Sequence, residues 1–220
     1  MNIEVRKKAI IDLHVHSNHS DGTCSPKSMI DAFAGDRKKS KLLAFTDHYS
    51  MVACTDELIE YAARRNVRLL RGTEIGVNYS KFNLKGLHIL GYGMKGLSIT
   101  ADRPDMKEVV GRITDAGGVA VIAHPLAIRF RETFHRLNDE QFEELLFKFK
   151  LAGGYGTEAY PANEFVEPAA LHKTQTIAKS LQLGFTGGSD FHGYKGQKLG
   201  NLYMTAGDTN ALLSAVKDRN

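Results

Sequence analysis

Cysteine is scarce in this sequence, and a long apolar run is missing. The two cysteines, Cys24 and Cys54, are far apart and form no CxxC pair, so buried reduced thiols are favoured over a disulfide or a thiolate site. No stretch approaches the roughly 18 apolar residues that a membrane span needs. The first ten residues also lack the apolar segment of a signal peptide. We therefore expect a cytoplasmic protein with no membrane partner.

Internal repeats, low-complexity tracts and proline- or serine-rich linkers are also absent. A chain of 220 residues with 42% hydrophobic residues suits a single domain whose core folds without a metal or a disulfide. The net charge of +4 and the pI near 9.0 are compatible with an anionic substrate. They are too low for a dedicated nucleic-acid binder.

Short aliphatic runs that end in polar clusters alternate with amphipathic segments along the chain. The runs are typical of strands and the segments of helices, so the alternation predicts an α/β fold with a parallel sheet. Ionisable residues gather where the strands end, which favours a barrel, because those ends converge on one face of a barrel. The predicted strands are 9–16, 41–48, 67–75, 87–93, 118–125, 156–160 and 183–192, and the predicted helices are 26–38, 52–65, 103–116, 139–150, 165–181 and 208–217.

Histidines concentrate at the predicted strand ends. A single histidine there is more often a hydrogen-bonded loop residue than a ligand, but six of the nine histidines share this position, together with several carboxylates. Residues two apart on a strand point to the same side, as the histidines of His-x-His and the pair of Asp-x-His would. Imidazole and carboxylate suit Zn, Mn and Fe, and the absence of cysteine argues against a structural zinc site. The residues are His14, His16, His48, His88, His124 and His192, with Asp21, Asp47, Glu74, Glu158 and Asp190.

Six motifs resemble those of the PHP (polymerase and histidinol phosphatase) family. In order, they are DLHVHSNHSDG, AFTDH, GTEI, HILGYG, VIAHP and GSDFHG, between residues 12 and 193. The resemblance is greatest to the stand-alone nucleotide phosphatases and exonucleases of the family. It implies a distorted (β/α)7 TIM-like barrel over 1–220, with a metal site at the C-terminal ends of the strands. It also implies a reduced lid near 94–116 and an insertion near 126–150.

The resemblance further implies two or three divalent metal ions, Mn, Fe or Zn, and assigns ligands to them. The first ion would be bound by His14, His16, Glu74 and Asp190, the second by Glu74, His88 and His124, and the third by Asp21, His48 and His192. Glu74 would bridge two ions, and Asp190 or His192 are candidates to protonate the leaving group. Asp12, on the same strand face as His14, and Asp47 are candidate supports of the ligands. Glu158 is either a support or ligand, or a substrate or structural contact. His19 is more typical of a solvated loop residue than of a substrate contact.

These residues predict a metal-dependent phosphoesterase that hydrolyses phosphate esters with a hydroxide bridging the metals. Arg129, Arg131 and Lys195 follow two of the strands and are candidate phosphate-binding residues, while Tyr160 and Phe191 are candidates to stack on a base. The expected substrate is a nucleotide or another small phosphorylated metabolite.

Four alternatives remain open at this point. The protein could be a histidinol-phosphatase-like phosphomonoesterase or a short-oligonucleotide exonuclease. It could instead hydrolyse amides, although no lysine accompanies the ligands to form a carbamylated bridge. A non-catalytic metal-binding domain is the fourth, although no expected ligand is missing. The sequence leaves the oligomeric state open.

Overall fold

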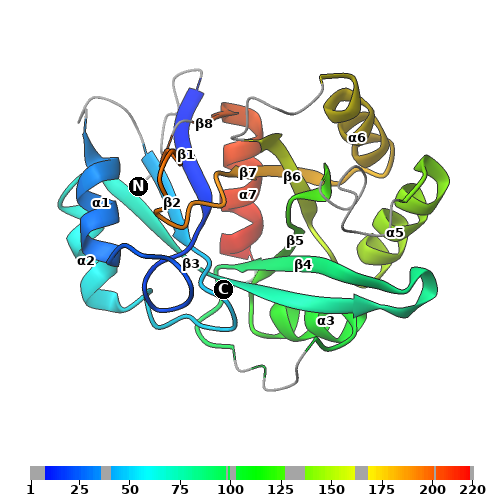
Figure 1. Cartoon of the computed structure of the whole chain (residues 1–220), viewed down its shortest axis with the longest axis horizontal. Coiled ribbons are helices and arrows are strands. Elements are labelled where there is room, and N and C mark those ends of the chain that lie inside the picture. Colours follow the sequence, from blue (N-terminus) through cyan, green and yellow to red (C-terminus); the bar gives the residue numbers. More distant parts are fainter. Residues whose placement is uncertain are drawn as a thin grey trace.

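Eight strands form one curved sheet that nearly closes into a barrel (Figure 1). The computed structural model describes residues 8–35, 41–97, 99, 103–126, 137–161, 168–200 and 202–218. The strand order in the sheet is β7-β6-β5-β4-β3-β2-β1-β8. The strands are β1 (Lys8–Val15), β2 (Lys41–Phe45), β3 (Val67–Tyr79), β4 (Leu84–Tyr92), β5 (Val119–Ile122), β6 (Gly156–Pro161), β7 (Gly184–Gly188) and β8 (Leu202–Thr205).

The barrel closes where the end of β7 meets β1. Val15 and Phe191 form a parallel bridge, and the main-chain N–H of His16 donates to the Phe191 carbonyl oxygen at 2.8 Å. A Cβ atom on Gly188 would lie 2.1 Å from the Cβ atom of His14. Glycine is therefore required here, because only a bare backbone lets β7 approach β1 this closely.

The sheet is mixed, which corrects the prediction of a parallel sheet. Strands β1, β2 and β3 are parallel neighbours, as are β5, β6 and β7, but β4 runs antiparallel to both β3 and β5. The reason is the short connection from β3 to β4, a 3₁₀ turn (Ser80–Phe82) followed by Asn83 in the left-handed conformation. Such a short connection joins only antiparallel strands. Strand β8, which the sequence pattern did not predict, pairs antiparallel with β1.

Six described helices surround the sheet, and α1, α2, α3 and α5 begin at capping residues that the sequence supplies. Ser25 caps the first helix, with Pro26 in its first turn, and Asn138 forms a capping box with Gln141. In Figure 1, α1 and α2 lie on one flank of the barrel and α5 and α6 on the other. Within the residues the structure describes, none of these helices combines the length and apolar character needed to cross a bilayer. The helices are α1 (Pro26–Ala34), α2 (Asp56–Ala63), α3 (Met106–Asp115), α5 (Asp139–Leu151), α6 (Pro168–Ser180) and α7 (Ala206–Asp218).

Helices α3 and α5 belong to the largest apolar cluster, which they form with β3, β4 and β5. Val109 and Ile113 of α3 and Phe142 and Phe149 of α5 are fully buried there. The segments predicted as a reduced lid and an insertion thus each contribute a helix to the core. That 94–116 is a reduced lid and that 126–150 is an insertion both stay predictions.

A bulge in β1 decides which side chains of this strand face the inside of the barrel. Asp12 pairs with Leu43 and Val15 with Phe45, so two residues of β1 stand opposite Ala44 alone. A bulge changes the alternation of side chains, and such bulges commonly lie next to functional sites. The prediction that Asp12 and His14 share one face is therefore wrong.

Candidate metal centre

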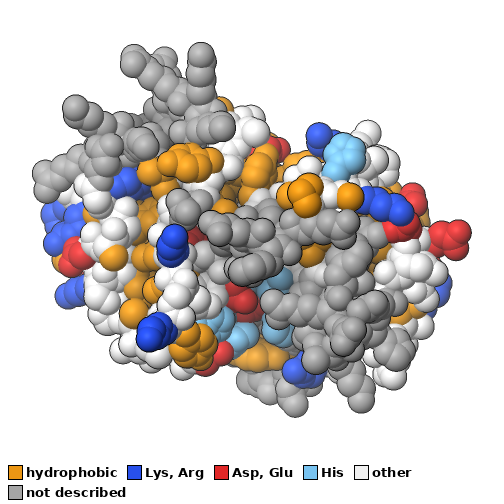
Figure 2. All heavy atoms as spheres, turned by 45° about the horizontal axis from the view of Figure 1, so that its top comes forward, with side chains coloured by type: hydrophobic (Ala, Val, Ile, Leu, Met, Phe, Trp, Pro, Cys, Tyr) orange, Lys and Arg blue, Asp and Glu red, His pale blue; other side chains and the backbone are white. Residues whose placement is uncertain are grey.

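Nine side chains converge in three groups at one end of the barrel. Within each group, the possible ligand atoms all lie within 4.8 Å of one another. Figure 2 shows the hollow in which histidine and acidic side chains meet. The groups are His14, His16, Glu74 and Asp190; Glu74, His88 and His124; and His16, Asp21, His48 and His192. The structure thus brings together all nine ligands that the family resemblance implied.

Glu74 lies at the centre of the groups, with a side chain that is only 2% exposed. Its Oε2 atom is 3.3 Å from His14 Nε2 and 3.1 Å from His16 Nε2. Its Oε1 atom is 2.8 Å from His88 Nδ1 and 3.2 Å from His124 Nε2. The two oxygens therefore face two different sets of imidazoles, as a bridging carboxylate requires.

The β3–β4 hairpin places Glu74 and His88 within strands rather than at strand ends, which corrects the prediction for these two residues. His88 pairs with Gly76, two residues after Glu74 on β3. A Cβ atom on Gly76 would lie 2.8 Å from the hydroxyl oxygen of Tyr49 and 3.6 Å from the His88 ring. The other ligands lie at or after the carboxyl ends of β1, β2, β5 and β7.

His16 belongs to two of the groups because its ring nitrogens face different ways. Its Nε2 atom is 3.3 Å from Asp190 Oδ1, whereas its Nδ1 atom is 3.5 Å from Asp21 Oδ1. Asp21 is half-exposed, and its Oδ2 atom lies 3.5 Å from His48 Nε2 and 3.4 Å from His192 Nε2. The Asp21 group is therefore the most open to solvent.

The donor atoms fit divalent cations. Among the described residues, four buried imidazole nitrogens have no hydrogen-bond partner: Nε2 of His14, Nδ1 and Nε2 of His16, and Nδ1 of His124. Buried polar atoms are normally paired, so this concentration of orphaned nitrogens needs an explanation. Imidazole nitrogens and carboxylate oxygens without cysteine suit Zn, Mn or Fe, and cations between them would pair most of these atoms.

The PHP domain model matches residues 12–180 of the sequence. The chain belongs to the PHP domain family. A curated relative, the 3',5'-nucleoside bisphosphate phosphatase of Chromobacterium violaceum, is 27% identical over 84% of this chain and 87% of its own length.

Solved structures share this PHP fold. An amidohydrolase from Chromobacterium violaceum with bound sulfate and no metal is 24% identical, with a TM-score of 0.75 over 96% of this chain and 97% of its own. An inferred metal-dependent phosphoesterase from Bifidobacterium adolescentis is 21% identical, with a TM-score of 0.73 over 93% of this chain and 96% of its own.

Three carboxylates, those of Asp47, Asp12 and Glu158, support the candidate ligands from behind. Asp47 accepts hydrogen bonds from the Ser17 main chain at 2.7 Å and from the Ser17 and Ser20 hydroxyls at 2.8 Å each, which shapes the loop before Asp21. Asp12 accepts from the Ser189 main chain and hydroxyl and from the Gly200 main chain, so it anchors the loop that carries Asp190. Burial raises the pKa of Asp12 to about 6, although these hydrogen bonds lower it.

Glu158, whose role the sequence left open, contacts two of the candidate ligands. Its carboxylate accepts a hydrogen bond from the His124 main chain at 2.6 Å and lies 3.2 Å from His14 Nδ1. An Nδ1–H donated to Glu158 leaves the Nε2 lone pair of His14 directed at Glu74 and Asp190.

Replacing Glu158 with glutamine should lower the affinity for Mn(II) about 10- to 100-fold, because the substitution removes the charge that fixes the His14 tautomer. Competition with a chelating dye measures this affinity. Glu143→Gln, at an exposed position on α5, is the matched control. Wild-type affinity in the Glu158 variant would show that this carboxylate does not orient His14.

Carboxylates set the charge state of the buried histidines. Burial disfavours the charged form of His16, but the neighbouring carboxylates of Asp190 and Glu74 outweigh it and raise its pKa to about 9. Burial of His14 is likewise outweighed by the charges of Glu74, Glu158 and Asp190, so its pKa lies well above 6.5. These histidines hold the pKa of Glu74 well below its usual value, against the effect of burial.

The affinity of the folded chain for Mn(II) is expected to rise with pH up to about pH 9. A proton on His16 stabilises the folded, cation-free chain below its unfolded pKa of 6.5, and this stabilisation is lost as the pH rises through about 9. A cation competes for the same nitrogen, so binding releases protons in this range. Calorimetry in buffers of different ionisation enthalpy measures the number of protons released. An affinity for Mn(II) that did not depend on pH would contradict the prediction.

The loop after β7 contains two residues near the candidate ligands that sequence reasoning missed. Gln197 accepts a hydrogen bond from the His192 main chain at 2.8 Å and donates one to the Asp190 carbonyl oxygen at 3.3 Å. Tyr194 stacks on the His192 ring. Neither residue belongs to a motif with a chemical signature, so only the folded loop reveals them.

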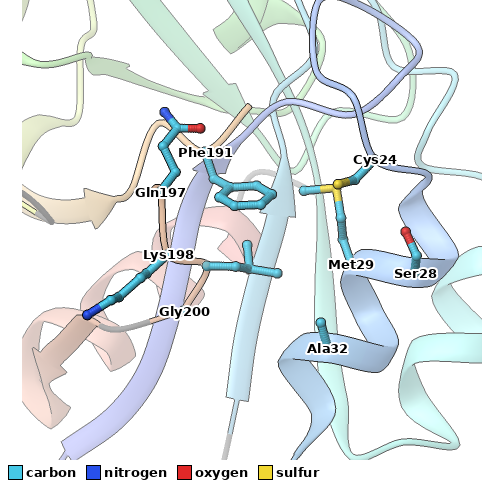
Figure 3. A pocket seen from close by; sticks show the side chains of 9 residues that line it. Cys24, Ser28, Met29, Ala32, Phe191, Gln197, Lys198 and Gly200 are labelled. Carbon is cyan, nitrogen blue, oxygen red and sulfur yellow. The ribbon is translucent and has the colours of Figure 1, made fainter. Parts of the chain in front are cut away.

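The predicted substrate-binding residues are placed only in part. Lys195 is exposed in the loop after β7, whereas Arg129 and Arg131 lie outside the described residues. His19 is exposed, as expected of a solvated loop residue. Phe191 does not face the metal ligands: with Met29, it points into a cavity of about 700 Å³ between α1 and this loop (Figure 3). None of the residues lining this cavity is one of the nine candidate ligands.

Proposed function

We propose that this PHP-family chain, a metal-dependent phosphoesterase, removes a phosphate from a nucleoside bisphosphate or a similar small phosphorylated compound. The observation that carries the proposal is the convergence of nine nitrogen and oxygen ligands around Glu74 in one open hollow. The substrate class is supported by the curated relative, which acts on 3',5'-nucleoside bisphosphates. A cytoplasmic location and two or three ions of Mn, Fe or Zn are parts of the same proposal.

Glu74 and Asp190 supply the negative charge that neighbouring cations need. Dications held a few ångströms apart repel each other strongly, and a buried carboxylate between them offsets that repulsion. When bound, divalent cations would lower the pKa of a water molecule and offset the charge on the phosphoryl oxygens. The role of Asp190, 3.3 Å from both His14 and His16, is to complete the most buried group.

His192 is better suited to hold a cation than to protonate a leaving group. Its Nδ1 atom lies 2.8 Å from the Asp190 carbonyl oxygen, which can only accept, so Nδ1 carries the proton. The Nε2 lone pair then faces Asp21 Oδ2. Proton donation by Asp190 or His192 therefore stays a prediction, and we place His192 first among the ligands.

A substrate panel tests the proposal. The Mn(II)-loaded protein should release one phosphate from adenosine 3',5'-bisphosphate with a higher kcat/KM than from adenosine 5'-monophosphate, histidinol phosphate or a dinucleotide. An N-acetylated amino acid tests amide hydrolysis. Release of phosphate from none of these substrates, with Mn(II), Fe(II) or Zn(II), would overturn the proposal. A preference for the dinucleotide would instead favour exonuclease activity.

A further inference from the structure

Tyr194 presents an exposed aromatic ring at the open side of the metal centre. It follows the ligand His192 by two residues, and 53% of the residue is exposed. The nearest of the three groups of candidate ligands is the one that contains Asp21. This group is the most open to solvent, and the Asp21 side chain is 51% exposed. A substrate that reaches the ligands from solvent on this side would pass Tyr194.

The ring of Tyr194 is held at both ends. It stacks on the His192 ring, with centroids 5.5 Å apart and an interplanar angle of 10°. Its hydroxyl donates to the Asp21 carbonyl oxygen at 3.2 Å, and its main-chain N–H donates to Gln197 Oε1 at 3.2 Å. A ring already fixed in this way loses little conformational entropy when a ligand stacks on it.

The Tyr194 ring stacks on His192 with one face, and about half of the residue stays exposed. The nearly parallel stack uses the face toward His192, and an exposure of about one half is what a ring with one free face retains. Such a face binds a planar π-system, and stacking on a nucleobase is tolerant of its identity.

The aromatic residues that the sequence suggested contact other parts of the fold. The Tyr160 hydroxyl donates to Asp208 at 2.6 Å, and Phe191 packs in the cluster that includes Val15 and Met29. Tyr49, which follows the ligand His48, is 41% exposed and donates its hydroxyl to the Gly76 carbonyl oxygen at 3.2 Å. Among the ring pairs of the described residues, Tyr49 has no stacked partner. The plane of its ring is therefore not fixed by stacking, whereas His192 fixes the plane of the Tyr194 ring.

We propose that the open face of Tyr194 stacks on the nucleobase of the substrate while a phosphate lies at the metal ligands. This inference rests on the proposed function and deepens it, because it assigns the part of the site that recognises the nucleoside. Tyr194 acts through its ring on substrate binding and takes no part in bond cleavage.

The experiment compares Tyr194→Leu and Tyr194→Phe in the full Mn(II)-loaded chain. Tyr194→Leu should raise KM for adenosine 3',5'-bisphosphate about 5- to 150-fold, the range expected for one stacked base. It should leave KM for the base-free ester ribose 5-phosphate within about 2-fold. Tyr194→Phe keeps the ring but loses the hydrogen bond to Asp21, so its KM for the bisphosphate should rise much less than that of Tyr194→Leu. Tyr203→Leu, at a similarly exposed tyrosine on β8, is the remote control.

Two outcomes would overturn the inference. An equal rise of KM for both substrates would show that Tyr194 only supports His192 and Asp21, and metal content would report the same defect. An effect of Tyr49→Leu in place of Tyr194→Leu would assign the base to Tyr49.

Direct binding separates this inference from the proposed function. If the wild-type protein hydrolyses no phosphate ester, calorimetry with adenosine 5'-monophosphate and with ribose 5-phosphate still tests Tyr194. Selective weakening of nucleotide binding in Tyr194→Leu would support the stacking role without catalysis. Equal affinities of the wild-type protein for the two compounds would overturn it.

Discussion

Replacing Glu74 with glutamine should lower kcat/KM of the Mn(II)-loaded protein on the order of 10³-fold and reduce the number of ions bound per chain. The reason is its position: the carboxylate lies within 3.4 Å of nitrogens of five histidines, His14, His16, His48, His88 and His124. An amide has no net charge to offset two neighbouring cations. Elemental analysis after gel filtration, together with phosphate release, measures both effects.

The matched control for this substitution is Glu144→Gln on α5. Glu144 pairs with Lys81 at the surface, so its replacement removes one carboxylate without touching the candidate metal centre. Wild-type metal content and activity are expected. A Glu74→Gln protein that kept both would contradict the bridging role.

Loading with Mn(II) should raise the Tm by about 8–16 °C when the free ion is at roughly 1,000 times its Kd. Binding to the folded state alone contributes about 4 kcal/mol at that ratio, and each kcal/mol shifts the Tm of a chain of this size by about 2–4 °C. The cation-free chain should still fold, because the three apolar clusters contain none of the nine candidate ligands. Differential scanning calorimetry with Mn(II) and with a chelator measures the difference.

The same measurement on Glu74→Gln separates specific binding from a general salt effect. The variant should show a smaller rise in Tm over the same Mn(II) range. A wild-type Tm that does not depend on Mn(II) would argue against metal binding, and loss of the folded state in chelator would show that the core alone is insufficient.

The β/α order was readable from the sequence because helix caps and strand runs are local signals. Ser25 and Asn138 begin helices as their side chains predict. The direction of β4 could not be read from the sequence. The turn that ends at Asn83 indicates a hairpin only when the strand that pairs with β3 is known. The predicted shared face of Asp12 and His14 failed for a related reason: the bulge between Asp12 and Val15 arises from the pairing of β1 with β2.

The sequence by itself determined the chemical type of the centre. His-x-His, Asp-x-His and the single Glu74 specify nitrogen and oxygen ligands wherever the chain places them, and six motifs in order specify the family. Only the tertiary structure decided that His16 faces two groups, that Glu158 orients His14, and that Tyr194 stacks on His192. These contacts join residues far apart in the chain or across an irregular loop, and their geometry follows from how β7 closes on β1.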